Sequence, residues 1–355
     1  MIQSLRLQNF RSYTDSQFEF EPGVNIIVGP NASGKTSLIE ALLVLSRGSS
    51  YKGQESDLVA FGEQWARLDG AYQGQDTRTV KLEIAGDGRI NKSFILNDLP
   101  KIRLNDQQRL PVVLFEPQHM SMLVGEPSLR REFLDDILAA SLPRYGVQLK
   151  NFRRVLSQRN SLLKRLYVSR KKEELFVWDL RLSELGGYIH DARAALLQDL
   201  SGGIAKRYNA ISGKNEQVTI SYVTDSTAAD YTTSLLATLS KSYDKDMDRG
   251  FTGSGPHRDD FVVSLRGHDA RTAASRGETR SLLLALKILE VKQLQQATGK
   301  RPLLLLDDVF SELDGHRRKA LAHALKSYQT FITTTDADVV IEHFMDTASV
   351  IPLAT

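Results

Sequence analysis

An eight-residue segment near the N-terminus has the composition and spacing of a phosphate-binding loop. It matches the pattern G-x-x-x-x-G-K-[ST] in full and consists of Gly29, Pro30, Asn31, Ala32, Ser33, Gly34, Lys35 and Thr36. In such a loop, backbone N–H groups and the start of a helix surround the phosphates of a nucleoside triphosphate. Lys35 is expected to reach the β- and γ-phosphates and the Thr36 hydroxyl to bind Mg²⁺, with Ser37 in the same first turn. The segment therefore predicts a site for a magnesium-bound nucleoside triphosphate.

Two consecutive aspartates, Asp307 and Asp308, end the apolar segment 303–306. Nucleotide-hydrolysing proteins hold Mg²⁺ with a carboxylate at the end of a buried strand, which assigns Asp307 to the metal. Asp308 would then orient or deprotonate the attacking water. The other interpretation is a surface turn after a core strand. The phosphate-binding loop favours the metal site, because Mg²⁺ on a triphosphate needs a carboxylate partner.

A third group, formed by Ser275, Arg276, Gly277 and Glu278, precedes the apolar segment 282–291. A serine hydroxyl, unpaired backbone N–H groups and the helix dipole at such a helix start attract an anion. The same residues also fit an ordinary helix N-terminus that Ser275 or Thr279 caps. Both interpretations stay open from the motif alone, although its place about 30 residues before Asp307 favours the anion site.

The elements around these residues predict an α/β protein with an inserted, mainly helical arm domain. An apolar run at 24–28 predicts a buried strand before the loop, and a helix with Leu38, Leu42 and Leu45 on one face follows and ends at Gly48. Further strands are expected at 5–7, 18–20, 112–115, 261–265, 303–306, 331–334 and 350–351, and an antiparallel hairpin at 80–84 and 90–96.

The middle of the chain, residues 127–250, is predicted to be the helical arm. Apolar residues there repeat about every 3.5 positions, which predicts two antiparallel helices of roughly 25 residues in an arm about 40 Å long. Gly186 and Gly187 interrupt the second of these helices. They indicate a bend or a close contact between helices.

The composition is that of a soluble globular chain in an intracellular compartment. The 355 residues include 46 Lys and Arg, 43 Asp and Glu and no Cys, with a net charge of +3. The lack of Cys excludes disulfides, thiolate catalysis and Cys-ligated zinc. The N-terminus lacks the features of a signal peptide, and no apolar run approaches the ~20 residues that cross a bilayer. A cytoplasmic location is expected.

Taken together, these motifs resemble the head of an ABC-type ATPase of the SMC class. The resemblance rests on the phosphate-binding loop, on residues 275–278 and 303–308, on residues 311–314, and on the closing strand 331–336. Within that class, residues 5–13, 255–260 and 305–314 resemble the bacterial recombination mediators, and the match runs nearly end to end, including 130–135.

The resemblance implies an ATPase head, formed by residues 1–126 and 251–355, that binds ATP and Mg²⁺ and forms a homodimer around them. Each ATP would lie between the phosphate-binding loop of one subunit and residues 275–278 of the other. Arg11 would contact the nucleotide and Gln118 the metal, beside Thr36 and Asp307. From the residues alone, Arg11 also fits a solvated position between two strands.

Lys35 and Asp308 are the expected catalytic residues, but two positions depart from the usual ABC pattern. Asp308 stands where most ABC heads have Glu, and Thr335 stands where they have a switch histidine. Proton transfer depends on hydrogen-bond reach, so the shorter Asp308 side chain predicts slow hydrolysis. The expected activity is a weak, DNA-stimulated ATPase that acts as a switch.

Basic residues in the arm predict contact with DNA. Twelve lie between 130 and 172, namely Arg130, Arg131, Arg144, Lys150, Arg153, Arg154, Arg159, Lys164, Arg165, Arg170, Lys171 and Lys172. Such a surface attracts phosphates through counterion release without reading the base sequence. The alternative is a solvated helix face, because basic residues also flank the contact between two helices.

The resemblance to recombination mediators implies specific partners. They are double-stranded or gapped DNA, a second copy of the chain in the presence of ATP, and the protein RecR, with loading of the RecA recombinase as the outcome in the nucleoid. Two alternatives remain, a transporter ATPase subunit and a structural SMC clamp. The inserted helical arm argues against the first, and the shortness of the expected helices argues against the second.

Overall fold

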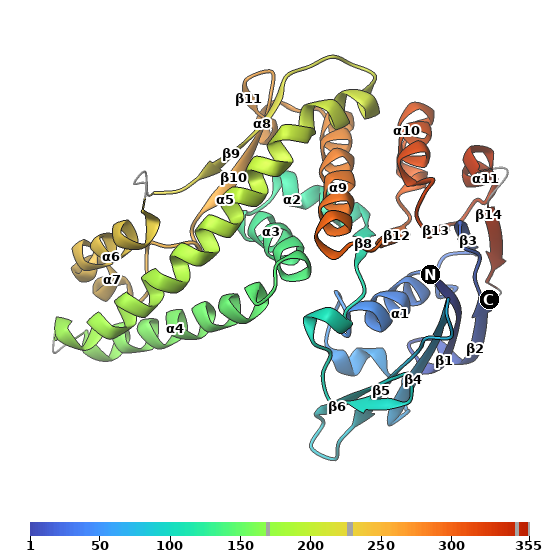
Figure 1. The fold of residues 1–355 in the computed structure, drawn as a ribbon, viewed down its shortest axis with the longest axis horizontal. Coiled ribbons are helices and arrows are strands. Elements are labelled where there is room, and N and C mark those ends of the chain that lie inside the picture. The colour runs from blue at the N-terminus through green and yellow to red at the C-terminus, as the bar shows by residue number, and fades with distance from the viewer. Residues whose placement is uncertain (168–170, 226–229, 345–347, 354–355) are drawn as a thin grey trace. The chain divides into compact units, whose positions relative to one another are not determined.

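The computed structural model describes residues 1–167, 171–225, 230–344 and 348–353, and the chain folds into two compact units (Figure 1). The first unit comprises Met1–His119 with Glu290–Thr355, and the second Met120–Leu289. Residues 251–289 lie in the second unit, where strand β10 (Asp260–Leu265) pairs with β9 (Val218–Val223). These two units differ from the predicted ATPase head, residues 1–126 with 251–355, and from the predicted arm, residues 127–250. A compact unit need not coincide with a functional domain, so the limits of head and arm stay a prediction.

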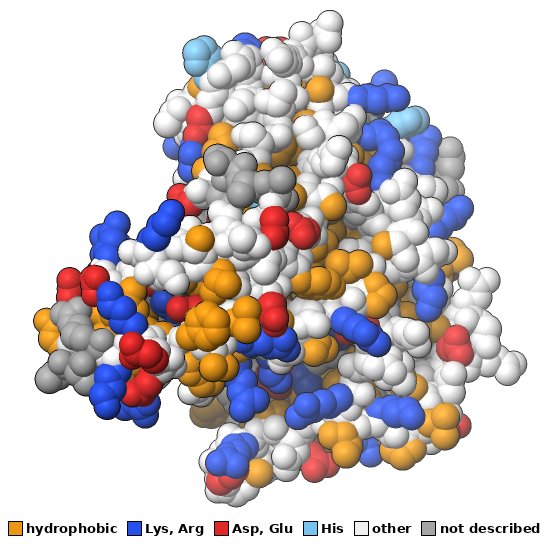
Figure 2. Space-filling view, turned by 60° about the vertical axis from the view of Figure 1, so that its left-hand side comes forward, with side chains coloured by type: hydrophobic (Ala, Val, Ile, Leu, Met, Phe, Trp, Pro, Cys, Tyr) orange, Lys and Arg blue, Asp and Glu red, His pale blue; other side chains and the backbone are white. Residues whose placement is uncertain are grey.

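The chain has a near balance of 46 basic and 43 acidic residues. Figure 2 shows Lys and Arg side chains interspersed with Asp and Glu side chains on one face of the molecule. Among the described residues, no helix is long and apolar enough to cross a membrane.

A parallel sheet of five strands forms one layer of the first unit. Its order is β14-β3-β13-β12-β8, with bounds Ala348–Pro352, Val24–Val28, Thr330–Thr334, Leu303–Asp307 and Val112–Phe115. Every neighbouring pair in it is parallel, so all five strands end at the same edge. The continuous apolar runs predicted these strands, because a sheet covered on both faces buries both sets of side chains. Helices α10 (Gly315–Leu325) and α11 (Asp338–Phe344) belong to the same unit.

An antiparallel sheet of six strands forms the other layer of this unit. Its order is β2-β1-β4-β5-β6-β7, with bounds Tyr13–Glu19, Ile2–Phe10, Trp65–Tyr72, Thr77–Ile84, Ile90–Leu96 and Leu99–Lys101. The predicted hairpin is confirmed as β5 and β6. Short 3-10 turns lie at Glu55–Leu58, Asp106–Gln108, Pro117–His119 and Phe310–Glu312.

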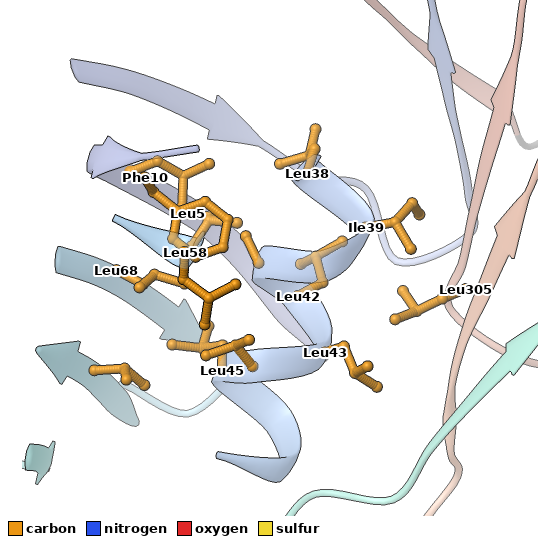
Figure 3. Packing of buried hydrophobic residues seen from close by; sticks show 14 of the residues in the cluster. Leu5, Phe10, Leu38, Ile39, Leu42, Leu43, Leu45, Leu58, Leu68 and Leu305 are labelled. Atoms are coloured by element: carbon orange, nitrogen blue, oxygen red, sulfur yellow. The ribbon is translucent and has the colours of Figure 1, made fainter. Parts of the chain in front are cut away.

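Helix α1 (Lys35–Arg47) packs between the two sheets (Figure 3). Leu38, Leu42 and Leu45 are fully buried against the antiparallel sheet, while the opposite side of the helix contacts Leu305 of the parallel sheet. Gly48 ends the helix in a left-handed conformation, with φ of 82°, as predicted. Burial on both sides fixes the start of α1, and therefore the phosphate-binding loop, against the parallel sheet.

The second unit is mainly helical. Its helices are α2 (Met120–Val124), α3 (Pro127–Ser141), α4 (Tyr145–Leu166), α5 (Phe176–Ser212), α6 (Tyr231–Lys241), α7 (Tyr243–Arg249), α8 (Ala270–Ala273) and most of α9 (Arg276–Thr298). Strands β9 and β10 form a small sheet there with β11 (His268–Asp269). The two predicted long helices are confirmed as α4 packed along α5, and α5 is longer than expected, with 37 residues.

The glycine pair in α5 marks a close contact between helices. A Cβ atom on Gly186 would lie 2.7 Å from the Leu235 side chain of α6, and one on Gly187 would overlap the Thr232 hydroxyl. Helix α5 runs without interruption through both positions. The glycines therefore let α6 approach α5, which is one of the two predicted roles.

Candidate nucleotide-binding site

The loop between β3 and α1 has a backbone that only small residues permit. Gly34 precedes α1 with φ of 94°, and a Cβ atom there would lie 2.8 Å from the Tyr13 hydroxyl. Tyr13 donates a hydrogen bond of 3.1 Å to the Gly34 carbonyl. A Cβ atom on Gly29 would lie 2.5 Å from the Ser33 hydroxyl. Both glycines of the motif are thus required by the local packing as well as by access for a phosphate.

Lys35 and Ser33 present polar groups along this loop. The Lys35 Nζ atom lies 2.8 Å from the carbonyl oxygens of Gly29 and Pro30, so the ammonium group lies over the loop. The Ser33 hydroxyl is buried and has no hydrogen-bond partner among the described residues. Because α1 begins here, its first N–H groups have no partner within the helix. These donors fit the oxygens of a triphosphate.

Thr36 and Asp307 meet at the edge where the parallel strands end. The Thr36 hydroxyl donates to the Asp307 carboxylate, with Oγ1 3.1 Å from Oδ1 and 3.0 Å from Oδ2. Thr333 of β13 donates to the same carboxylate at 2.8 Å. Asp307 is only 7% exposed, although it lies 271 residues after Thr36. A hydroxyl and a carboxylate side by side are oxygen ligands that fit Mg²⁺ beside the loop.

Asp308 is turned away from strand β12 by its backbone. Its φ of 53° is left-handed, and its N–H donates to the Thr333 hydroxyl at 2.9 Å. The exposed carboxylate accepts a hydrogen bond of 2.7 Å from the Ser311 hydroxyl. Ser311 therefore orients the expected water-activating group, a role that the sequence motif did not indicate.

Arg11 is held in a nearly buried ion pair and is not the solvated residue of the alternative interpretation. Its guanidinium donates to Glu40 of α1 through two bonds of 2.8 and 2.9 Å. The Glu40 side chain is 3% exposed and that of Arg11 is 24% exposed. Glu40 lies one helical turn after Thr36, so the pair fixes Arg11 beside the start of α1. A contact between Arg11 and the nucleotide stays a prediction.

Tyr51 and Glu116 were not found by sequence analysis. The Tyr51 hydroxyl is buried and has no hydrogen-bond partner among the described residues. Burial and the nearby carboxylates of Asp307 and Glu116 raise the pKa of Tyr51. Glu116 follows β8, in which Phe115 pairs with Leu306, so it follows the strand next to Asp307. The pairing of β8 with β12 would have indicated that Glu116 lies near Asp307, whereas no local sequence pattern indicates that Tyr51 lies there.

Gln118 and Thr335 also follow strands of the parallel sheet. Gln118 is exposed in the 3-10 turn Pro117–His119 after β8, and its contact with the metal stays a prediction. Thr335 is exposed directly after β13. Most ABC heads have a histidine at the position of Thr335. A threonine side chain does not change its charge near neutral pH, so Thr335 cannot act as a titrating switch.

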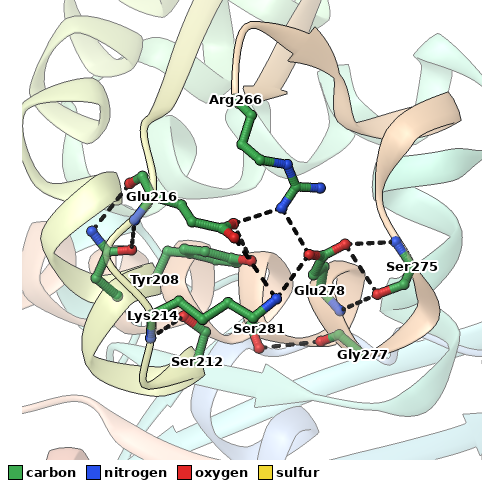
Figure 4. A network of polar contacts seen from close by, with 10 residues as sticks. Tyr208, Ser212, Lys214, Glu216, Arg266, Ser275, Gly277, Glu278 and Ser281 are labelled. Atoms are coloured by element: carbon green, nitrogen blue, oxygen red, sulfur yellow. Dashed lines mark hydrogen bonds and ion pairs between the residues drawn. The ribbon is translucent and has the colours of Figure 1, made fainter.

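The segment 275–278 begins helix α9 in the second unit, and here the helix-cap interpretation is confirmed (Figure 4). The Ser275 backbone N–H and hydroxyl donate to Glu278 Oε2 at 2.9 and 3.0 Å, and the Glu278 N–H donates to the Ser275 hydroxyl at 3.3 Å. This reciprocal pair is a capping box. Ser275 and Arg276 are exposed, so the cap does not exclude a contact with a second molecule.

The basic residues of the arm fall into several environments. Arg131 is half-buried and donates to the Asp259 carbonyl at 2.9 Å, and Arg170 lies outside the described residues. Eight are exposed, namely Arg144, Lys150, Arg153, Arg154, Lys164, Arg165, Lys171 and Lys172.

Two basic residues of that set are buried in ion pairs. Arg130 is 1% exposed and makes bonds of 2.7 and 2.9 Å to Asp260. Arg159 is fully buried, with bonds of 2.6 Å to Asp179 and 2.9 Å to Asp246. The expectation that Arg130 and Arg159 contribute to a phosphate-binding surface is therefore wrong, because both guanidinium groups are buried and paired with carboxylates.

A family model described as the RecF/RecN/SMC N terminal domain matches residues 1–352. The chain is similar to "DNA replication and repair protein RecF" of Streptococcus equi subsp. zooepidemicus, with 38% identity over 94% of this chain and 91% of that protein. It is 36% identical to the protein of that name from Heliobacterium modesticaldum, over 94% of this chain and 92% of the relative.

Solved structures agree with these relatives. The recombination mediator protein RecF-ATPrS in the RecFOR pathway matches with a TM-score of 0.89 and 31% identity, over 100% of this chain and 96% of that one. RecF-ATP in the same pathway matches with a TM-score of 0.84 and 31% identity, over 94% and 92%. An Smc head bound to the C-winged helix domain of ScpA, at 16% identity and a TM-score of 0.56, shares the fold.

Proposed function

This chain belongs to the RecF family of DNA replication and repair proteins, and we propose that it is a recombination mediator whose ATP-bound homodimer holds DNA. The observation that carries the proposal is the contact of Thr36 with Asp307 beside a complete phosphate-binding loop. ATP binding would close the dimer on duplex or gapped DNA, and slow hydrolysis would release it.

The side chains of the loop and of the end of β12 would have separate roles in hydrolysis. Lys35 would bind the β- and γ-phosphate oxygens, and Thr36 and Asp307 would hold Mg²⁺, which neutralises phosphate charge when bound. Asp308 would orient the attacking water and accept its proton, with the carboxylate directed by Ser311. Because aspartate is one methylene shorter than glutamate, the proton acceptor has less reach, which supports a weak ATPase.

The second half of each ATP site would come from a partner subunit. Ser275, Arg276 and Gly277 lie at an exposed helix start, where unpaired N–H groups and the helix dipole favour an anion. Arg11 beside the loop and Gln118 beside the metal would complete the site. RecR is a proposed partner, supported by the RecFOR pathway that the matching solved structures name.

Size-exclusion chromatography with ATP and Mg²⁺, with and without a short duplex carrying a single-strand gap, tests the function. We expect a nucleotide-dependent dimer that binds the gapped duplex. Lys35→Ala should remove both, while Lys101→Ala, which removes an exposed lysine of β7, should change neither. A dimer that persists in Lys35→Ala contradicts the gating role. A dimer that forms with ATP but ignores DNA fits a transporter subunit instead.

A further inference from the structure

The helix start at Ser275 carries an acid where an anion is expected to bind. Glu278 lies in the first turn of α9, three residues after Ser275. An uncompensated carboxylate there would repel a triphosphate, because like charges in a partly desolvated interface raise the free energy of association. The structure therefore has to neutralise Glu278 if this surface meets a nucleotide.

Two basic residues from different elements do so (Figure 4). Arg266, in the turn after β10, lies 2.9 Å from Glu278 Oε1, and Lys214, which follows the end of α5, lies 3.1 Å from the same atom. The other carboxylate oxygen, Oε2, accepts from Ser275. One oxygen of Glu278 is thus neutralised and the other closes the cap.

The two cations are themselves held in place. Glu216 accepts from Arg266 at 2.8 Å and from the Tyr208 hydroxyl at 3.3 Å, and it lies 3.7 Å from Lys214. The set contains two acids and two bases, so its net charge is zero. Hydrogen bonds from Arg266, Ser275 and Lys214 keep the pKa of Glu278 well below its usual range, so it stays ionised near neutral pH.

We propose that Arg266 and Lys214 are positioning residues, which neutralise Glu278 and keep its carboxylate turned onto Ser275. The start of α9 then presents the backbone N–H groups of Arg276 and Gly277 to the phosphates of the nucleotide on a second copy of the chain. This inference rests on the proposed function, since it assumes that two copies share the nucleotide. It assigns a role to residues outside the four-residue motif.

A double-mutant cycle tests the proposal, with the ATP-dependent dimer dissociation constant measured by analytical ultracentrifugation. Arg266→Gln should weaken the dimer about tenfold, because the charge of Glu278 is then less compensated. Glu278→Gln removes the carboxylate and serves only as the second background of the cycle, in which its own effect on the dimer is measured. In the Glu278→Gln background, Arg266→Gln should have little effect, because no carboxylate remains to be neutralised. Lys214→Gln provides a second, independent cycle.

The controls separate this role from others. Arg271→Gln removes a nearby, comparably exposed cation that pairs with Asp269, and it should change dimerisation less than twofold. Equal weakening by Arg266→Gln in both backgrounds would overturn the proposal, because Arg266 would then act without Glu278. No weakening in the wild-type background would overturn it too. If the unmodified protein itself stays monomeric with ATP, the proposed function fails first. Melting temperatures of all variants report loss of fold separately.

Discussion

At the scale of single residues, the backbone at the end of β12 separates two neighbouring carboxylates. Asp307 stays in the strand and faces Thr36, while the left-handed φ of 53° turns Asp308 out toward Ser311. Among non-glycine residues, Asp and Asn tolerate this conformation best. The same backbone thus points adjacent side chains in different directions, as the proposed roles of Asp307 as a metal ligand and Asp308 as a proton acceptor require.

Asp308→Asn tests the proposed role of Asp308 as the proton acceptor in ATP hydrolysis. Asparagine keeps the left-handed backbone, so the fold and the contact of Asp307 with Thr36 should be unaffected. We expect ATP turnover to fall by about 10²–10³-fold, because the proton acceptor is lost, while the ATP-dependent dimer persists. Steady-state phosphate release together with ultracentrifugation measures both. Turnover within twofold of the wild type would mean that another group accepts the proton.

His257 makes the stability of the second unit depend on pH. Burial lowers its pKa from 6.5 to about 4, and its Nε2 atom lies 3.1 Å from the Thr252 carbonyl. Between these pH values the unfolded chain binds a proton that the folded chain does not, so stability falls as the pH falls. The slope should reach at most about 1.4 kcal/mol per pH unit from this residue.

Urea denaturation at pH 7, 6 and 5 measures this contribution. His257→Gln removes the titrating ring, so its free energy of unfolding should change less with pH than that of the wild type. Parallel curves for the two proteins would show that His257 takes up its proton equally in the folded and unfolded states. His268→Gln, at an exposed position of β11, serves as the matched control.

At the scale of elements, the contact between α5 and α6 depends on the absence of side chains at Gly186 and Gly187. A methyl group at Gly187 would overlap the Thr232 hydroxyl, whereas one at Gly202 of the same helix would meet nothing within 4 Å. Substitutions at Gly187 and Gly202 therefore distinguish the contribution of helix propensity to stability from that of packing. Both substitutions by alanine favour the helical backbone equally.

Gly187→Ala should destabilise the protein by about 1–3 kcal/mol, because the overlap forces the Thr232 side chain, or α6 with it, to move. Gly202→Ala should stabilise it by about 0.5–1 kcal/mol, because alanine is the better helix former. Urea unfolding of both variants measures the free energies. A stabilising effect of Gly187→Ala would show that α6 moves aside at no cost.

Much of the architecture could be predicted because strands and helices leave local patterns. The apolar runs at 24–28 and 303–306 predicted the two strands that carry the loop and Asp307. The motifs assigned Thr36 and Asp307 to one metal, and the structure places the two side chains in contact. Long-range ion pairs leave no such pattern. Arg159 looks like one more base on a helix, but its partner Asp246 lies 87 residues later. The burial of the Tyr51 hydroxyl could not be predicted from the sequence either, because it depends on the complete fold.

At the scale of the whole molecule, the exposed cations of the arm are the proposed contacts with DNA. Lys150 and Arg154 are exposed on α4, unlike the buried Arg159 on the same helix. Lys150→Glu combined with Arg154→Glu should weaken DNA binding and lower the slope of log affinity against log salt by about 1–2. Fluorescence anisotropy of a labelled duplex across a salt series measures the slope. An unchanged slope would place the phosphate contacts elsewhere.

Helix α5 connects the two ends of the second unit mechanically. A stiff rod of 37 residues begins at Phe176, near the end of the arm, and finishes two residues before Lys214. The close contact of α6 with α5 at Gly187 lies between these two ends. If α5 tilts as one rod about this contact, Lys214 moves relative to Glu278, so a load on the arm would reach the start of α9 without any helix melting.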